Sequence, residues 1–362
     1  MHEEASELRA FLPDFIHKLT KTGFEVHLEE EYGTTNGFNF NDYKLENATI
    51  HSCNREEVFQ KDYVLIVRSP HDDEFNLIGE KSCLIAMLHF PTRPSRVALL
   101  QEMGIQAISL DGIVNDFHIR IVENMKAVAW NGLEVAFNEL EKKWPNLLRE
   151  DHKPWQVLVI GTGMVGMHTI DAASKFGRLE RNNEHINLGG SGVLVTAIGR
   201  NVTYQGKHMK HLLEKTDVLV DATQRTDPSK PVVPNNWIAW LPEHAIIVDL
   251  SVDPYLLVSN PQVVKGIEGI PEGNLDKYVF ASNDPDWDKT VPASIPSKNR
   301  RTTITCYSWP GIHAESCMRH YAQQLLPLML VLYNKNYRKI SANGSFFERA
   351  LFRAKLDTFM NK

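Results

Sequence analysis

The chain has 362 residues, of which 43% are hydrophobic and 23% charged, and its formal net charge is −6. These proportions are typical of a soluble globular protein whose core is large enough for two domains. The negative charge gives no reason to expect nucleic acid or an anionic membrane as a partner, and no apolar run is long enough to span a bilayer.

The cysteines and the N-terminus indicate a reducing compartment. The four cysteines are scattered without a C-x-x-C pair, which favours free thiols over disulfides or zinc. His313 and Cys317 could share a helical face, but no further ligand accompanies them, so we predict no metal site. The polar, acidic N-terminus argues against a signal peptide, and we expect a cytoplasmic protein.

Strands and helices alternate over the first hundred or so residues. Apolar residues at helical spacing predict helices over 7–20 and 94–103. Short apolar or alternating runs predict strands over the following ranges: 24–28, 64–67, 82–88 and 106–110. This alternation indicates an α/β domain with a parallel sheet.

A long helical pattern at 119–144 leads through a polar linker into the second half of the chain. Further strands are predicted over these ranges: 157–160, 193–198, 217–222 and 245–250. Residues 178–192 are polar and glycine-rich and predict a surface insertion, and 271–301 predict a long loop. Helices are expected over 312–333 and 346–359.

A glycine motif follows the strand at 157–160. Gly161, Gly163 and Gly166 have G-x-G-x-x-G spacing and precede an apolar helical run. In a dinucleotide site the first glycine makes the turn, the second admits the pyrophosphate, and the third allows close packing of helix and strand. A purely structural strand-turn-helix corner is the alternative. The predicted cofactor-binding residues here are Gly161, Thr162, Gly163, Met164, Val165 and Gly166.

Gly199 and Arg200 follow the next strand of the nucleotide unit. NAD-binding proteins usually have a ribose-binding carboxylate at this place, and that carboxylate would repel a 2′-phosphate. A glycine followed by an arginine removes the carboxylate and supplies a guanidinium. The pair therefore favours NADP(H), with NAD(H) as the alternative, unless Arg200 is an ordinary surface residue.

Ligands of open parallel sheets bind outside the carboxyl ends of the strands. Besides the Gly199-Arg200 pair, this rule selects Arg68, His89 and Asp253. His89 could transfer a proton near neutral pH, and Arg68 or Arg9 could bind a substrate carboxylate. For either arginine alone, a solvated surface role is the alternative.

Five motifs in order resemble those of one enzyme family. They are His2-Glu3 with Glu7-Leu-Arg9, Val64-Leu-Ile-Val-Arg-Ser-Pro70, Met87-Leu-His89, Ile247-Val-Asp-Leu-Ser-Val-Asp253 and Tyr307-Ser-Trp-Pro-Gly311. On these segments the chain resembles the alanine dehydrogenase family. That family also includes the transhydrogenase alpha subunit and, more distantly, saccharopine dehydrogenase.

The resemblance implies an α/β fold with two Rossmann-like domains. A nucleotide domain, 127–315, would be inserted into a discontinuous substrate domain, 1–126 and 316–362, with the active site in the cleft. The implied roles are carboxylate binding by Arg9 and Arg68 and acid/base chemistry by His89. Asp253 would be a second catalytic residue that either binds near the nicotinamide ribose or orders the reacting groups, and Ser308 and Trp309 would contact the cofactor.

The chain also departs from the family pattern. Arg68 stands where alanine dehydrogenases have a lysine, Ser308 where asparagine is usual, and Gly199-Arg200 where an acidic residue is usual. The family's first strand would end just before Met1. Either the start codon is assigned too late or this variant lacks the strand, and we favour the first explanation.

The sequence therefore predicts an NAD(P)H-dependent oxidoreductase that transfers hydride at the CH–NH carbon of an amino acid or of an imine formed from a 2-oxo acid. Arg68 favours a saccharopine- or opine-type reductase over a plain L-alanine dehydrogenase. The alternative is a nucleotide-binding module like the transhydrogenase alpha subunit, without an amino-acid substrate of its own. The expected partners are small molecules, not nucleic acid or membrane, and assembly into a homo-oligomer stays open.

Overall fold

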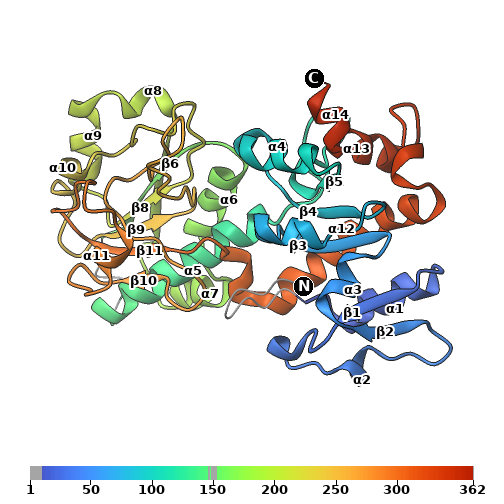
Figure 1. The fold of residues 1–362 in the computed structure, drawn as a ribbon. Coiled ribbons are helices and arrows are strands. Elements are labelled where there is room, and N and C mark those ends of the chain that lie inside the picture. Colours follow the sequence, from blue (N-terminus) through green and yellow to red (C-terminus); the bar gives the residue numbers. More distant parts are fainter. Residues whose placement is uncertain (1–9, 146, 148–152, 362) are drawn as a thin grey trace. The chain divides into compact units, whose positions relative to one another are not determined.

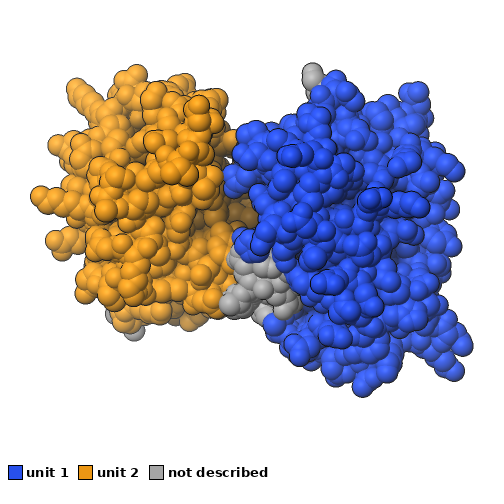
Figure 2. Space-filling view, in the orientation of Figure 1, with its two compact units in different colours: residues 1–124, 313–362 blue, residues 125–312 orange. Residues whose placement is uncertain are grey.

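The computed structural model describes residues 10–145, 147 and 153–361 (Figure 1). Arg9 and the motif residues before it lie outside the described residues. The chain forms two compact units (Figure 2): unit 1 comprises residues 1–124 and 313–362, and unit 2 comprises residues 125–312. The predicted α/β fold, with one domain inserted into a discontinuous other, is confirmed.

Unit 1 contains two small parallel sheets. The strands of one sheet, in spatial order, are β3 (Tyr63–Arg68), β4 (Cys83–Met87) and β5 (Gln106–Ser109). The other sheet pairs β1 (Val26–Glu29) with β2 (Ile50–Cys53), a strand that the sequence analysis did not predict. The helices of unit 1 are α1 (Pro13–Lys21), α2 (Phe40–Tyr43), α3 (Arg55–Phe59), α4 (Pro94–Glu102), α12 (Ala314–Asn334), α13 (Phe346–Ala354) and α14 (Leu356–Met360).

The three-stranded sheet of unit 1 is buried on both faces. Successive side chains of a strand point to opposite faces. Ile85 on β4 packs in a cluster with residues of α1 and α12, whereas its neighbour Leu84 packs with residues of α3, α4 and α14. This double burial explains why β4 appears in the sequence as a continuous apolar run.

The two sheets of unit 1 are separate. A cavity of about 880 Å3 is lined by residues of β1 and of β3, together with apolar side chains of α1 and α12 such as Phe15, Leu19, Met329 and Leu332. Strands β1 and β3 therefore belong to different sheets and do not pair with each other.

In the described part of unit 2 the strands form one six-stranded sheet, with the order β10-β11-β9-β8-β6-β7. Figure 1 labels β10, β11, β9, β8 and β6 in this order. The parallel strands of this sheet are β6 (Trp155–Ile160), β7 (Val193–Ile198), β8 (Val218–Asp221), β9 (Ile246–Asp249) and β11 (Thr302–Thr305). The edge strand β10 (Val279–Phe280) is antiparallel. The strand order changes direction at β6, and this switch point is where open α/β sheets bind ligands.

Helices cover both faces of this sheet. Val157 and Val159 pack with residues of α5 (Met125–Lys143) and α6 (Met164–Ala173), and Leu158 and Ile160 face the opposite side. That second side is covered by α9 (Gly206–Leu213) and α10 (Asn235–Ile238). The remaining helices are α7 (Leu179–Asn187), α8 (Arg200–Thr203) and α11 (Trp287–Thr290).

The structure differs from the predictions in several segments. The predicted surface insertion 178–192 contains the helix α7, which is anchored by Arg181, whose side chain is buried and donates to the Phe176 carbonyl at 2.7 Å. Helix α5 begins at Met125 instead of 119. The predicted loop 271–301 contains β10 and α11, stabilised by burial of Trp287.

All four cysteines are buried, and no disulfide joins any two of them. Within the described part of the chain, no helix is long and apolar enough to cross a membrane.

Candidate functional site

The glycine motif forms a tight turn from β6 into α6. Gly161 has φ +107°, in the region that favours glycine. A Cβ on Gly161 would overlap the carbonyl oxygen of Ala222, and a Cβ on Gly166 would overlap the carbonyl oxygen of Gly161. The chain's own packing therefore requires glycine at both positions.

Gly163 is different, because a Cβ there would meet no atom within 4 Å. It precedes the first residue of α6, and Met164 beside it is 50% exposed. The first N–H groups of a helix have no partner within the helix, and they suit an anion such as a pyrophosphate. Backbone atoms pack closely against Gly161 and Gly166, whereas the space beside Gly163 is open. This open space would allow a dinucleotide to approach the backbone of the turn.

Gly199 and Arg200 lie beside this turn. Ile160 and Ile198 are register partners on β6 and β7, and the Gly161 N–H donates to the Ile198 carbonyl at 2.9 Å. The exposed Arg200 donates to the Gln224 carbonyl at 3.0 Å. The guanidinium is therefore held at the carboxyl-end edge of the sheet, where the 2′-phosphate of NADP(H) would be expected.

Two buried carboxylates occupy the same edge and were not predicted. Asp221 and Asp249 are register partners at the ends of β8 and β9, and each is 1% exposed. The Ser251 hydroxyl donates to Asp249 at 2.9 Å and lies 3.3 Å from Asp221. Burial raises the pKa of Asp221 to about 6, and the neighbouring Asp249 carboxylate adds to the rise.

Lys265 stabilises the charge of Asp249. Its buried ammonium donates to Asp249 Oδ2 at 3.0 Å and to the backbone carbonyl of Asp253 at 2.9 Å. Burial alone would raise the pKa of Asp249, but the charge and hydrogen bond of Lys265, with bonds from Val252 and Ser251, lower it overall. The network therefore pairs one buried anion with one buried cation and positions the loop after β9.

Asp253, the predicted residue near the nicotinamide ribose, is held in an ion pair. Arg225 donates to Asp253 Oδ2 through Nη2 at 2.6 Å and through Nε at 3.2 Å. The Asp253 side chain is 34% exposed, and burial raises its pKa despite the attraction of Arg225. Arg225 was not selected by the sequence analysis.

Ser308 and Trp309, predicted as cofactor contacts, have buried side chains, 2% and 1% exposed. The Trp309 indole N–H donates to the Asp249 carbonyl at 2.8 Å, and the Trp309 carbonyl accepts from Asn131 at 2.8 Å. In this structure both side chains lie in the interior of unit 2, where Trp309 connects β9 to α5.

In unit 1, Arg68 and His89 follow two neighbouring parallel strands. Arg68 is the last residue of β3 and is in register with Met87, which ends β4 two residues before His89. Both residues therefore lie at the carboxyl-end edge of the three-stranded sheet. The third predicted substrate residue, Arg9, lies outside the described residues.

Asp111 fixes the position of His89. The His89 backbone N–H donates to Asp111 Oδ1 at 3.0 Å, and Nδ1 lies 3.3 Å from Asp111 Oδ2. The Ser109 hydroxyl donates to the same Oδ1 at 2.7 Å. Asp111 is 6% exposed, and burial alone would raise its pKa, but the bonds from His89 and Ser109 hold that pKa well below its usual range.

The backbone at His89 is also unusual. Its φ of +53° lies in the left-handed region, which a non-glycine residue adopts at an energetic cost. The hydrogen bond from its N–H to Asp111 stabilises this conformation. The His89 side chain remains 46% exposed, so its outer nitrogen is accessible.

Asp111 was not predicted from the sequence, although the rule that ligands bind beyond the carboxyl ends of parallel strands would have selected it. Asp111 comes two residues after β5, the neighbour of β4, and so lies at the same sheet edge as His89. The signal is the carboxyl-end position of the predicted strand 106–110.

Comparisons with known proteins agree with this architecture. The sequence profile of the family described as "Alanine dehydrogenase/PNT, N-terminal domain" matches residues 2–129. Alanine dehydrogenase 1 of Staphylococcus aureus is 29% identical over 120 residues, which cover 33% of this chain and 32% of that protein. The sequence match thus spans about a third of the length of this curated relative.

Solved structures match almost the whole chain. An L-alanine dehydrogenase superposes with a TM-score of 0.71 at 18% identity, covering 98% of this chain and 92% of that chain. A transhydrogenase from Sinorhizobium meliloti superposes with a TM-score of 0.61 at 16% identity, covering 91% of this chain and 92% of that chain. At these identities the likeness shows the fold.

The parallel sheets and the glycine turn at the switch point define a Rossmann-type fold, in which dinucleotides bind at the turn after the first strand. Within that fold, residues 2–129 match the N-terminal domain of the alanine dehydrogenase and transhydrogenase family, and the whole chain has the fold of an L-alanine dehydrogenase. The resemblance predicted from the sequence is confirmed.

Proposed function

We propose that this protein is a nicotinamide-dependent dehydrogenase or reductase that acts at the CH–NH carbon of an amino acid, or of an imine formed from a 2-oxo acid and an amine. The observation that carries the proposal is the β6–α6 turn, closed by packing at Gly161 and Gly166 and open at Gly163. The match of residues 2–129 to the alanine dehydrogenase and transhydrogenase N-terminal domain supports it, as does the fold shared with an L-alanine dehydrogenase.

The nicotinamide cofactor, when bound, supplies or accepts the hydride. The backbone at Gly163 and the first turn of α6 would bind the pyrophosphate. Arg200 would pair with a 2′-phosphate, because its guanidinium lies beside the glycine turn and no carboxylate follows β7 directly. We therefore infer a preference for NADP(H) over NAD(H).

His89 would transfer the proton. The Asp111 carboxylate lies 3.3 Å from Nδ1 and favours the Nδ1–H tautomer, which would leave the lone pair on Nε2. Nε2 can then take a proton from the substrate nitrogen during oxidation and return it during reduction. Asp111 is a positioning residue, because it acts through the imidazole and its backbone.

Arg68 would bind a carboxylate of the substrate. A guanidinium offers two parallel N–H donors to a carboxylate and does not exchange protons at physiological pH. A permanent cation suits substrates with an additional carboxylate. We therefore favour a saccharopine- or opine-type reductase, which joins an amino acid to a 2-oxo acid, over an L-alanine dehydrogenase.

The test is a substrate screen with the purified chain. NADPH oxidation is followed in the presence of 2-oxo acids paired with either ammonia or amino acids, and the products are identified by mass spectrometry. The expected result is oxidation that requires both the oxo acid and the amine, with a product that contains a new C–N bond. Omission of the amine is the control for simple reduction of the oxo acid.

The alternative is a nucleotide-binding module like the transhydrogenase alpha subunit, favoured by the fold match to a transhydrogenase. Tight NADPH binding without turnover on any oxo acid and amine pair would contradict the proposed reaction and support this alternative. Hydride exchange between NADPH and an oxidised NAD analogue, measured with added partner subunits, would then distinguish it from an inactive preparation.

A further inference from the structure

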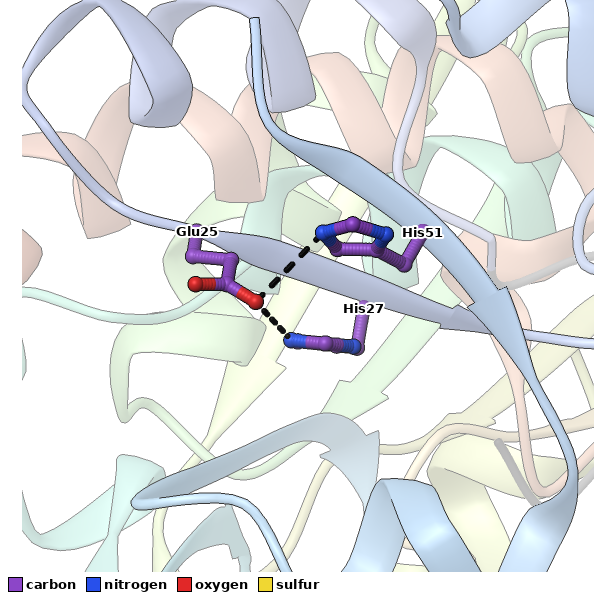
Figure 3. Close-up of side chains that lie close together, drawn as sticks. All are labelled: Glu25, His27 and His51. Carbon is purple, nitrogen blue, oxygen red and sulfur yellow. Dashed lines mark hydrogen bonds and ion pairs between the residues drawn. The ribbon is translucent and has the colours of Figure 1, made fainter.

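Two histidines and a glutamate meet on the two-stranded sheet of unit 1 (Figure 3). His27 on β1 and His51 on β2 are register partners on neighbouring strands. Glu25 stands two residues before His27, so that its side chain projects to the same face. Leu28, on the alternate face, is buried in the core of the unit.

The three side chains converge on one point. Glu25 Oε1 lies 2.8 Å from His27 Nε2 and 3.4 Å from His51 Nε2. All three ligand atoms lie within 4.8 Å of one another, and the two imidazole rings are stacked with centroids 4.9 Å apart. Figure 3 shows both rings directed at the same carboxylate oxygen.

The two separations from Glu25 Oε1, 2.8 Å to His27 Nε2 and 3.4 Å to His51 Nε2, are close to those of atoms that share a metal ion. Zinc binds imidazole nitrogen at about 2.0–2.1 Å and carboxylate oxygen at about 2.0–2.2 Å. Two ligands at such distances lie about 3.0 Å apart at an octahedral ion and about 3.4 Å apart at a tetrahedral ion, by simple geometry from these bond lengths. A hydrogen bond between Glu25 and His27 explains the shorter contact, and a shared ion would explain both contacts together.

We propose that Glu25, His27 and His51 bind one divalent transition-metal ion, with water in the remaining coordination positions. Two imidazoles and one carboxylate form a donor set suited to zinc, copper or nickel, and not to magnesium or calcium, which prefer oxygen. The Glu25 and His51 side chains are 58% and 50% exposed, so an ion can enter from solvent.

The ion would connect β1 to β2. Two-stranded sheets are only marginally stable by themselves, and this one has four register pairs. A metal that binds the folded arrangement more tightly than the unfolded chain stabilises that arrangement. The proposed ion would therefore stabilise the fold, and its ligands are different from the residues proposed for catalysis.

Sequence analysis predicted no metal site. His27 and His51 are distant in the sequence, and they become neighbours only because β2 pairs with β1 in parallel. Since β2 was not predicted, no pattern indicated that its histidine would lie beside that of β1.

Zinc titration of the full-length, tag-free chain tests the proposal. The protein is first treated with a chelator and dialysed, and zinc binding is then measured by calorimetry. The expected result is one ion per chain, with at least tenfold weaker affinity in His51→Ala and in His27→Ala. The matched control is His211→Ala, which removes an exposed histidine from α9 in unit 2 and should bind zinc as the wild type does.

Two further measurements separate binding from folding. Circular dichroism of the metal-free variants should match that of the wild type, so that a lost affinity is not a lost fold. Cobalt(II), bound in place of zinc, should give visible ligand-field absorption that disappears in His51→Ala. Absence of stoichiometric zinc binding to the wild type, or wild-type affinity in folded His51→Ala, would overturn the proposal.

Discussion

Asp111 holds His89 at two points, since its Oδ1 accepts the His89 backbone N–H at 3.0 Å and its Oδ2 lies 3.3 Å from the ring Nδ1. The first contact stabilises a left-handed backbone, and the second favours the Nδ1–H tautomer. The buried Asp111 carboxylate therefore sets both the orientation of the His89 imidazole and which ring nitrogen carries the proton. The His89 side chain remains 46% exposed.

We expect His89→Asn to leave NADPH binding unchanged and to lower turnover by roughly 10²–10⁴-fold, the usual contribution of general acid–base catalysis. Asparagine tolerates the left-handed backbone, so the fold should survive. Asp111→Asn should cause part of this loss, because an amide has a single oxygen and cannot accept from both the His89 backbone N–H and Nδ1–H. Steady-state kinetics and NADPH titration check both variants.

The matched control for this prediction is His118→Asn. His118 is also a histidine with positive φ, at +61°, but it is exposed and away from Asp111. It should retain wild-type turnover. Wild-type turnover in His89→Asn on the best substrate would instead exclude His89 as the acid/base.

Gly163→Val and Gly166→Ala should differ in what they disrupt. A side chain at residue 163 meets open space, so the variant should fold but lose NADPH affinity, because valine would occupy the pyrophosphate position. Even a methyl group at residue 166 would overlap the Gly161 carbonyl, so that variant should lower the unfolding temperature. Circular dichroism with NADPH titration distinguishes the two effects. A folded Gly163→Val protein with normal affinity would show that the turn is only a structural corner.

Arg200→Ala should weaken NADPH selectively. Loss of a charge-assisted contact costs about 1–3 kcal/mol, or about 5- to 150-fold in the dissociation constant. NADH, which lacks the 2′-phosphate, should bind almost as before. Lys210→Ala, which removes another exposed charge from unit 2, is the control. Equal affinities of the wild type for NADPH and NADH would contradict the proposed preference.

Asp221 should make unit 2 less stable as pH rises. Its pKa is raised from 3.8 to about 6 in the folded state, so between these values the folded state retains a proton that the unfolded chain has lost. The free energy of unfolding should therefore fall across this window, by at most about 3 kcal/mol for a shift of this size. Asp221→Asn cannot ionise, so its stability relative to the wild type should increase from pH 4 to pH 7. Urea unfolding at both pH values measures this difference, and a difference independent of pH would refute the assignment.

Arg68→Ala should mainly raise the Michaelis constant for the oxo acid, because it removes a cation that binds the substrate before and during the reaction. Arg68→Lys should restore only part of the affinity, since an ammonium lacks the bidentate fork. It should also shift the preference toward simple 2-oxo acids with ammonia. Unchanged Michaelis constants in both variants would remove Arg68 from the substrate site.

The sequence predicted most strands because they are buried on both faces. A strand such as β4 then appears as an unbroken apolar run, and the strand before Gly161 is recognisable in the same way. By contrast, β2 and β11 are short and rich in polar or β-branched residues, and α7 lies in a polar segment. Their stability comes from pairing with β1 and β9 and from the buried Arg181, which are tertiary contacts.

The sequence by itself determined the glycine turn, the glycine-arginine pair after β7, and the positions of Arg68 and His89 after apolar strands, because each depends on residues that are close together in the chain. Only the tertiary structure placed Asp111 against His89, Asp249 between Asp221 and Lys265, and His51 beside His27. These partners come from different strands or loops. Parallel strands are joined by helices and loops, so residues that lie side by side on two strands can be far apart in the sequence. The charge and position of each group depend on such neighbours, which are determined by strand order and register and not by local spacing.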